Sequence, residues 1–284
     1  MSDMRTETDS LGEVRLPALA LYGANTLRGA QNLCFSGQPL HHEPAFVRAF
    51  AQCKMAAALA NRDLGVLSPQ IAQAITTACE ELLNGQHAQD LVVDLMEGSG
   101  GTSTNMNFNE VIANRAQQLL GARAGAYDLV HPNDHVNRSQ STNDVYPSAM
   151  KIAVHARLDP VVRELDALAG ALLEKAAEFD DVLHLGRTCL QDAQPMYLGQ
   201  AFGGYASLAG RLKASLQGAQ AQLLDLPLGA TAIGTGLGSN PGYKRAVFAH
   251  LARITGVPFR AAHDPFDAMQ NMDAFSRVSA ELRT

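Results

Sequence analysis

The chain has 284 residues, 46% of them hydrophobic and 18% charged, which is enough for one large domain or two ordinary domains with hydrophobic cores. Its formal net charge of -6 provides no basic field, so the composition argues against a nucleic-acid partner or an anionic membrane surface. A small-molecule enzyme fits these numbers better.

The length of the apolar runs and the spacing of the cysteines indicate the cellular compartment. No run of about 18 apolar residues occurs, and Met1 to Ser10 is polar and acidic, so we expect a soluble protein that is neither exported nor held in a membrane. The four cysteines show no C-x-x-C pairing, so neither a disulfide framework nor a cysteine zinc site is indicated. The cytoplasm is the expected location.

The first half of the chain predicts helices separated by polar segments. Residues 1–40 mix glycine and proline with short apolar runs, which indicates irregular or short-strand structure. Apolar groups three and four apart predict helices from Pro44 to Leu64 and from Ser68 to Leu83. Two stretches rich in Gly, Ser, Thr and Asn follow, 94–108 and 121–147, with a short helix predicted between them from Asn109 to Leu120.

The second half predicts longer helices. Apolar residues mark one face of each of two helices, at Val161, Leu165, Leu168 and Leu172, and at Phe202, Tyr205, Leu208, Leu212, Leu216, Ala219 and Leu223. A glycine-rich loop is predicted from Gly229 to Gly242, and a further helix starts at Lys244. Strand and helix do not alternate, so a parallel-sheet fold is disfavoured and a mainly α fold is expected.

Two of the polar clusters could bind an anion. Gly98 to Asn109 (GSGGTSTNMNFN) offers hydroxyls, amides and backbone N–H groups, although a capped helix start explains it equally well. In the second cluster, Ser141, Thr142 and Asn143 place three short hydrogen-bonding side chains in succession, which would suit a carboxylate. His131, Asp134 and His135 have a spacing that metal ligands could have, but hydrogen-bonded loop histidines are the simpler interpretation.

Two later clusters are less specific. Gly186 to Ala193 forms a polar turn before the long helix, in which Asp192 could cap that helix. Cys189 could be a nucleophile, but without a local base partner it is better interpreted as lining a polar pocket. Leu228 to Gly238 lacks the G-x-G-x-x-G spacing and has no predicted strand ahead of it, so a dinucleotide site is rejected.

Taken in this order, the four clusters resemble the aspartase/fumarase superfamily. The similarity begins at Arg5 to Pro17 and covers nearly the whole chain. Thr102 to Asn107 (TSTNMN) is similar to the aspartase form rather than to the T-Q-S-N-M-N of fumarases, Ser141 to Asp144 (STND) contrasts with S-S-N-D, and Leu228 to Leu237 is also most similar to aspartases. Three blocks therefore favour the aspartase branch.

The resemblance implies roles for individual residues. The side chains implied to hold the substrate carboxylates are Thr102, Ser141, Thr142, Asn143 and Thr188. A second anion site is implied at His131, Asn133 and Asp134. Thr188 and Cys189 stand where the family has catalytic residues, but Cys189 replaces the His of fumarases and the Gln of some aspartases. No organic cofactor and no metal are implied.

The resemblance also implies domains and an assembly. We expect an N-terminal, mostly helical lyase domain at 1–138 and part of a central helical bundle at 139–284. Family members form homotetramers in which each site is built from three subunits, so apolar helix faces of this chain are expected to need covering. Relatives continue to a G-S-S-x-M-P-x-K-x-N-P loop that carries the catalytic base serine, and this loop is absent from the sequence.

The expected activity is reversible elimination of ammonia from L-aspartate to give fumarate, which makes the protein a carbon–nitrogen lyase. The small dicarboxylates L-aspartate and fumarate are the expected ligands. Three alternatives stay open. One is a fumarate hydratase that converts fumarate to L-malate, another is a different elimination of this superfamily on a larger succinyl substrate, and the third is a catalytically silent, lyase-like assembly subunit.

Overall fold

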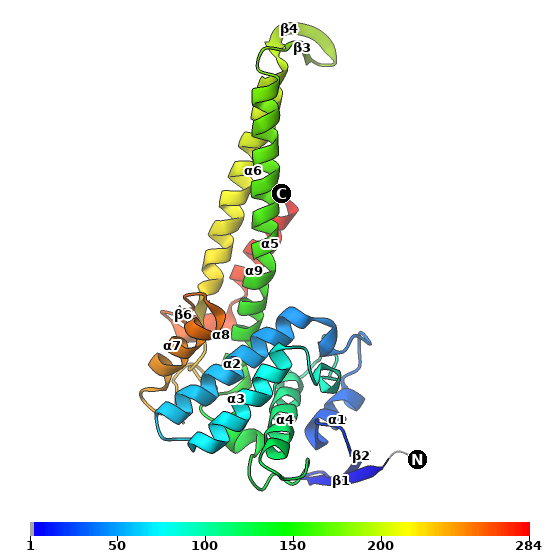
Figure 1. Cartoon of the computed structure of the whole chain (residues 1–284), viewed down its shortest axis with the longest axis vertical. Helices are drawn as coiled ribbons and strands as arrows, with labels where there is room; N and C mark the ends of the chain where they lie inside the picture. The colour runs from blue at the N-terminus through cyan, green and yellow to red at the C-terminus, as the bar shows by residue number, and fades with distance from the viewer. Residues whose placement is uncertain (1–2) are drawn as a thin grey trace. The chain divides into compact units, whose positions relative to one another are not determined.

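The computed structural model describes residues 3–284, which form two compact units (Figure 1). Unit 1 comprises Met1–Ala153 and Leu224–Asn271, and unit 2 comprises Val154–Leu223 and Met272–Thr284. The domain boundary expected between residues 138 and 139 stays a prediction.

Unit 1 is mostly helical. It contains a β1–β2 hairpin (Met4–Asp9 and Gly12–Pro17) and a two-residue parallel pair, β5 and β6 (Asp225–Leu226 and Arg260–Ala261). Its α-helices are α1 (Ala24–Asn32), α2 (Pro44–Asp63), α3 (Pro69–Leu83), α4 (Thr102–Leu119), the start of α5 (Thr142–Glu178), α7 (Tyr243–Thr255) and α8 (Pro265–Gln270). Three single turns complete it: η1 (Leu40–His42), η2 (Ala88–Asp90) and η3 (Pro132–Val136).

Unit 2 is built on two long helices. The remainder of α5 leads into a β-hairpin, β3 (Leu183–Thr188) and β4 (Gln191–Tyr197), and the chain returns along α6 (Leu198–Ala221), the turn η4 (Gln222–Leu224) and, later, α9 (Asp273–Arg283). Gly199 is required at the hairpin end, because a Cβ there would lie 2.2 Å from the carbonyl oxygen of Ala176. A small apolar core holds α5, α6 and α9 together: Leu158, Leu216, Ala219, Leu223, Ala274 and Val278.

The mainly α fold predicted from the sequence is confirmed, with the helices from Pro44 and from Ser68 in their expected places. Ser68 caps α3 by accepting the N–H of Ile71 at 3.3 Å. The glycine-rich loop before α7 and the long α6 are also confirmed. Among residues 3–284, no helix is both long and apolar enough to cross a membrane.

Three predictions about local structure were wrong. The segment Thr102 to Phe108 is the start of α4 rather than a loop, because the amide groups of Asn105 and Asn107 are buried and hydrogen-bonded in the core instead of solvated. A helix, α1, lies within residues 1–40. Asp192 does not cap α6, since it lies in β4 and pairs with Arg187, whereas Tyr197 occupies the cap position.

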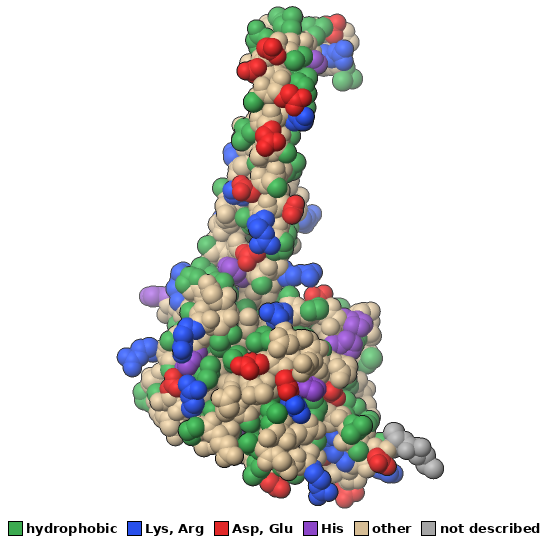
Figure 2. All heavy atoms as spheres, viewed as in Figure 1, with side chains coloured by type: hydrophobic (Ala, Val, Ile, Leu, Met, Phe, Trp, Pro, Cys, Tyr) green, Lys and Arg blue, Asp and Glu red, His purple; other side chains and the backbone are tan. Residues whose placement is uncertain are grey.

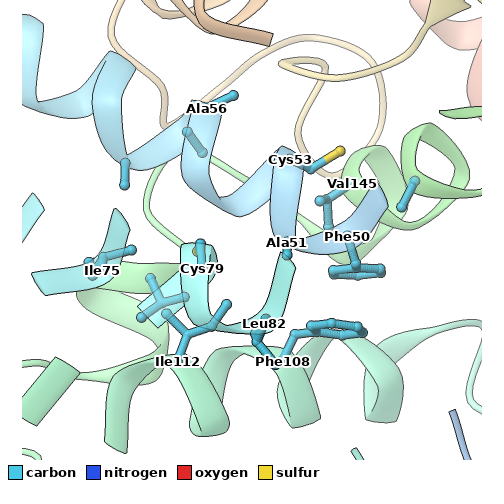
Figure 3. Close-up of a cluster of buried hydrophobic side chains, with 14 of the residues drawn as sticks. Phe50, Ala51, Cys53, Ala56, Ile75, Cys79, Leu82, Phe108, Ile112 and Val145 are labelled. Atoms are coloured by element: carbon cyan, nitrogen blue, oxygen red, sulfur yellow. The ribbon is translucent and has the colours of Figure 1, made fainter. Parts of the chain in front are cut away.

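The core of unit 1 lies where α2, α3 and α4 pack side by side (Figure 3). The rings of Phe50 and Phe108 stack with centroids 4.3 Å apart and planes 7° apart, and both side chains are fully buried. Alanines on α2 let α3 approach closely, and Ile75, Cys79 and Leu82 fill the space between these helices. The polar site described below is built on this core.

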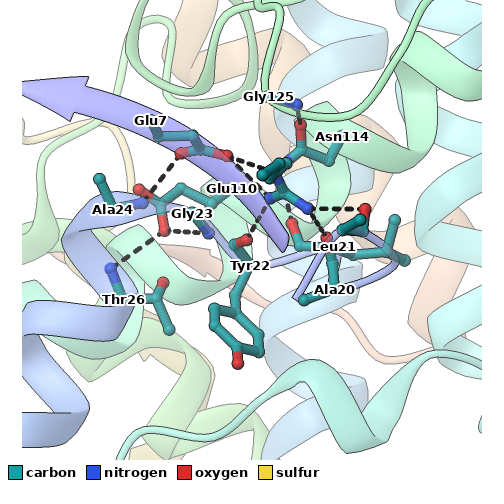
Figure 4. Close-up of polar contacts among 12 residues, drawn as sticks. Glu7, Ala20, Leu21, Tyr22, Gly23, Ala24, Thr26, Glu110, Asn114 and Gly125 are labelled. Atoms are coloured by element: carbon teal, nitrogen blue, oxygen red, sulfur yellow. Dashed lines mark hydrogen bonds and ion pairs between the residues drawn. The ribbon is translucent and has the colours of Figure 1, made fainter. Parts of the chain in front are cut away.

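Buried carboxylates tie the N-terminal hairpin to the core (Figure 4). Glu110 of α4 accepts the backbone N–H groups of Gly23, Asn25 and Thr26 at 2.8–3.0 Å, which satisfies the start of α1. Glu7 of β1 accepts the N–H of Ala24 at 3.0 Å and pairs with Arg5. The buried carboxylates of this region are therefore partnered within the protein.

The outside of unit 2 exposes hydrophobic side chains along its helices (Figure 2). The larger ones on α5 and α6 are Val161, Leu168, Leu173, Tyr205 and Leu208. Apolar residues spaced along a helix at the surface are typical of faces that another helix covers.

We expect Phe50→Ala to lower the free energy of unfolding by about 3–5 kcal/mol, because it removes a buried ring and leaves a cavity against Phe108. Chemical denaturation measures the change. The control is Leu19→Ala, at a side chain that is 92% exposed, which should change stability by less than about 0.5 kcal/mol. Equal stabilities of the two variants would contradict this description of the core.

Candidate functional site

A pocket of about 440 Å³ opens in unit 1 beside the start of α5. Three segments that are distant in sequence form it, namely the first turns of α4, the turn from η3 into α5, and the glycine-rich loop. The lining residues are Asn105, Met106, Asn133, Asn137, Ser139, Gln140, Ser141, Thr142, Thr231, Ala232, Leu237 and Gly238. Hydroxyl and amide groups dominate this lining, and none of its residues is charged.

Asp144 joins two of these segments. Its side chain is fully buried, and Oδ1 accepts the N–H of Ser141 at 2.9 Å while Oδ2 accepts those of Gly229 and Thr231 at 2.9 and 3.0 Å. Burial raises the pKa of this carboxyl to about 6, although the three amides and the nearby Lys54 favour its charged form. The carboxylate thus holds the glycine-rich loop against the start of α5.

Lys54 of α2 lies beneath the pocket with no exposed surface. Its Nζ donates to Oδ1 of Asn105 at 2.7 Å and to Oδ1 of Asn137 at 2.9 Å, and it lies 5.7 Å from the centre of the Phe50 ring. Burial lowers the pKa of Lys54 to about 7, and the attraction of Asp144 opposes this shift. The pocket therefore has a cationic group under its neutral lining.

The start of α5 supplies the remaining donors. Asn143 is exposed, and its Nδ2 donates to the carbonyl oxygen of Ala232 at 2.7 Å, which ties the loop to the helix a second time. The Ser141 hydroxyl oxygen accepts the N–H of Asn143 at 3.2 Å. A helix N-terminus lined with hydroxyls and amides favours an anion, and a carboxylate has the size and acceptor geometry for this pocket.

The predicted carboxylate-binding residues divide between the two units. Ser141 and Thr142 line the pocket, whereas Thr102 is exposed at the first position of α4 and Asn143 acts on the loop. Thr188 and the exposed Cys189 belong to unit 2, at the end of β3. Cys189 and Leu190 have positive φ values of 49° and 63°, as a tight two-residue hairpin turn requires.

The residues of the predicted second anion site lie at the start of η3. Nδ1 of His131 accepts the N–H groups of Asn133 and Asp134, both at 3.3 Å. Nδ1 also lies 3.3 Å from Oδ2 of Asp134, but a nitrogen that accepts these N–H groups has no proton to give a carboxylate. Asn133 also lines the pocket. Within residues 3–284, no group of three or more His, Cys, Asp or Glu side chains could hold a metal ion.

Sequence reasoning missed Lys54, Asn105 and Asn137 as parts of the site. A signal for Lys54 was present, since it follows Phe50 by four positions and precedes Asn61 by seven, on the face of α2 that packs into the core. A lysine at such a position has to find a partner. Asn105 and Asn137 lie within the predicted polar stretches, but nothing distinguished them from the other polar residues there, because asparagine is common in turns.

Comparison with known proteins now decides the family. A family described as lyases matches residues 12–284. The chain belongs to this lyase family. The membership of the aspartase/fumarase superfamily that the four polar clusters predicted is thereby confirmed.

Individual members of the lyase family are similar over the whole chain. Aspartate ammonia-lyase of Helicobacter pylori is 44% identical over 280 residues, 99% of this chain and 60% of that protein. Fumarate hydratase class II of Nitrosomonas europaea is 45% identical over 285 residues, 100% of this chain and 61% of that protein. The crystal structure of fumarate lyase:delta crystallin from Brucella melitensis bound to cobalt superimposes with a TM-score of 0.94 at 42% identity, over 99% of this chain and 61% of that one. The chain thus spans about 60% of the length of these relatives.

We expect Asp144→Asn to loosen the glycine-rich loop, because an amide group cannot accept all three N–H bonds and each buried N–H without an acceptor costs about 1–3 kcal/mol. Hydrogen exchange measured by mass spectrometry should show faster exchange at Gly229 and Thr231. Asp225→Asn is the control, since Asp225 forms a partly exposed ion pair with Arg260. Unchanged protection in the Asp144 variant would contradict the role of the carboxylate.

The lowered pKa of Lys54 predicts how the free energy of unfolding changes with pH. The unfolded chain keeps the lysine proton up to about pH 10.5, whereas the folded chain releases it at about pH 7. Between these values the unfolded state binds more protons, so Lys54 makes the free energy of unfolding rise with pH. The midpoint of thermal unfolding should therefore rise less steeply above pH 7 in Lys54→Met than in the wild type. Lys244→Met, at an exposed position on α7, should keep the wild-type slope, and a wild-type slope in Lys54→Met would rule out the buried cation.

Proposed function

We propose that the protein to which this chain belongs reversibly eliminates ammonia from L-aspartate to give fumarate, as a carbon–nitrogen lyase without an organic cofactor. The observation that carries the proposal is the pocket of hydroxyl and amide groups at the start of α5, within the S-T-N-D segment. The similarity to aspartate ammonia-lyases over 99% of the chain supports it.

The chemistry explains why such a pocket is needed. Removing the proton next to a substrate carboxylate creates a second negative charge on that group, which preorganised donors must stabilise in the transition state. Ser141 and Thr142 offer hydroxyl donors in the pocket. In our proposal they hold one substrate carboxylate, and Thr102 and Asn143 contribute to substrate binding. Thr188 and Cys189 belong to unit 2 and are proposed as the substrate-binding and catalytic positions that the family resemblance implies.

The remaining parts of the proposal concern the assembly and a second site. The exposed apolar side chains on α5 and α6 suit a homotetramer in which helices of other subunits cover them. His131, Asn133 and Asp134 are proposed to lie near a second anion site. The cytoplasm is the proposed location.

The fumarate hydratase alternative is supported by the 45% identity to the Nitrosomonas europaea enzyme. Both reactions share fumarate and differ in the group that leaves, either ammonia or water. A site for either reaction must hold two carboxylates, so the pocket does not discriminate between them, whereas an assay does.

The experiment is an assay of the full-length natural protein for fumarate formation, measured by ultraviolet absorbance, with L-aspartate or L-malate as substrate. We expect fumarate from aspartate and none from malate. Fumarate from malate alone would establish the hydratase, and a folded protein inactive on both would establish the silent subunit. In the same assay Ser141→Ala should lower kcat/KM at least about tenfold, since one hydroxyl donor is lost, while Ser10→Ala in the exposed β1–β2 turn should not.

A further inference from the structure

A chain of hydrogen bonds lies beneath the pocket. The buried residue at one end of this chain decides which groups donate and which accept. A lysine ammonium has donors and no acceptor, so any amide atom that bonds to it must be the carbonyl oxygen. Lys54 bonds to one atom of Asn105 at 2.7 Å and one atom of Asn137 at 2.9 Å. The lysine therefore decides which way round both amide groups are held.

Asn105 links Lys54 to the pocket, and its orientation fixes the donor and acceptor roles there. With its oxygen turned to Lys54, its Nδ2 donates to Oδ1 of Asn137 at 3.1 Å and to Oγ1 of Thr142 at 3.0 Å. Thr142 is the acceptor in the second bond, so its own hydroxyl proton remains available. Across residues 3–284 no protein atom accepts that proton, and Thr142 lines the pocket.

The other branch of the chain ends inside the protein. Nδ2 of Asn137 donates to the carbonyl oxygen of Gln140 at 3.4 Å, which holds the turn that leads into α5. The amide groups of Asn105 and Asn137 are thus both used, and the hydroxyl of Thr142 is the donor that this network presents at the pocket lining.

Neighbouring groups offset part of the cost of burying the Lys54 ammonium. The titratable groups that face it are Asp144 on α5, Cys53 on α2 and Cys79 on α3. Burial raises the pKa of both thiols far above neutrality, so Asp144 supplies the negative charge, and the face of the Phe50 ring lies 5.7 Å from Nζ. An anion in the pocket above would add to this attraction.

We propose that Lys54 is a positioning residue, which acts through Asn105 to make Thr142 a hydrogen-bond donor toward a dicarboxylate in the pocket. A carboxylate can only accept hydrogen bonds, so it binds a hydroxyl that donates and is repelled by one that presents its lone pairs. The identity of the ligand rests on the proposed function, whereas the donor and acceptor roles follow from the hydrogen bonds of Lys54 alone.

The test is the binding of succinate, a dicarboxylate with no group to eliminate, to the full-length protein by isothermal titration calorimetry. The pH is kept below the Lys54 pKa of about 7. Lys54→Met and Thr142→Val should each weaken binding about tenfold or more, as expected for loss of a charge-assisted or buried hydrogen bond. The double variant should bind succinate with the same affinity as the single variant that binds it less tightly, because both changes remove the same donor.

Two results would overturn the proposal. One is wild-type affinity in Lys54→Met, and the other is a double variant whose loss is the product of the two single losses. Ile75→Val controls for a general loss of stability, since Ile75 is fully buried in the same core but does not line the pocket. If circular dichroism shows that Lys54→Met does not fold, Lys54→Leu replaces it. This apolar side chain has no donor for Asn105 or Asn137, so weaker binding is again expected, and wild-type affinity again overturns the proposal.

Turnover gives a second, independent measurement. A substrate-positioning role predicts that Lys54→Met raises KM for L-aspartate as well as lowering kcat, because the donor contacts the carboxylate both in the bound substrate and in the transition state. A structural defect would only reduce the active fraction and leave KM unchanged. An unchanged KM would therefore count against the proposal. If the wild type binds succinate but converts neither aspartate nor malate, the proposed function fails while the Lys54 inference is still tested by calorimetry.

Discussion

The buried carboxylate of Asp144 holds together two of the segments that form the site. A single buried carboxylate accepts N–H groups from Ser141, Gly229 and Thr231, and so connects the first turn of α5 with a loop more than eighty positions later in the chain. Glycines let this loop adopt positive φ values, and without an anchor such a backbone would be mobile. The pocket exists because the loop is held over the helix start.

Burying this carboxylate and Lys54 together has an energetic reason. Each charge would be costly alone in the core, and each reduces the cost of the other by attraction across a desolvated region. Donors to the carboxylate come from the backbone, whereas the lysine meets side-chain amides. The helices α2 and α4, which carry Lys54 and Asn105, are fixed by the aromatic stack of Phe50 and Phe108, so packing in the core sets the geometry of the polar groups above it.

Part of this arrangement was predictable from the sequence, and the reasons for the rest are physical. Helices α2 and α3 were predicted because their apolar residues follow the helical period, and Ser141 and Thr142 because three short polar side chains in succession suit an anion. The helical start of α4 was missed because asparagine favours turns unless its amide finds partners in the core. Asn107, for example, accepts the backbone N–H groups of Val92 and Val93, and no local pattern reveals contacts of this kind.

A crystal structure of the full-length protein with succinate bound tests most directly the claim that this pocket holds a substrate carboxylate. We expect a carboxylate oxygen within hydrogen-bond distance of the Thr142 hydroxyl, with the bonds from Lys54 to Asn105 and from Asn105 to Thr142 retained. Succinate bound away from Ser141 and Thr142, or a Thr142 hydroxyl that donates to a protein acceptor while succinate is bound, would contradict it.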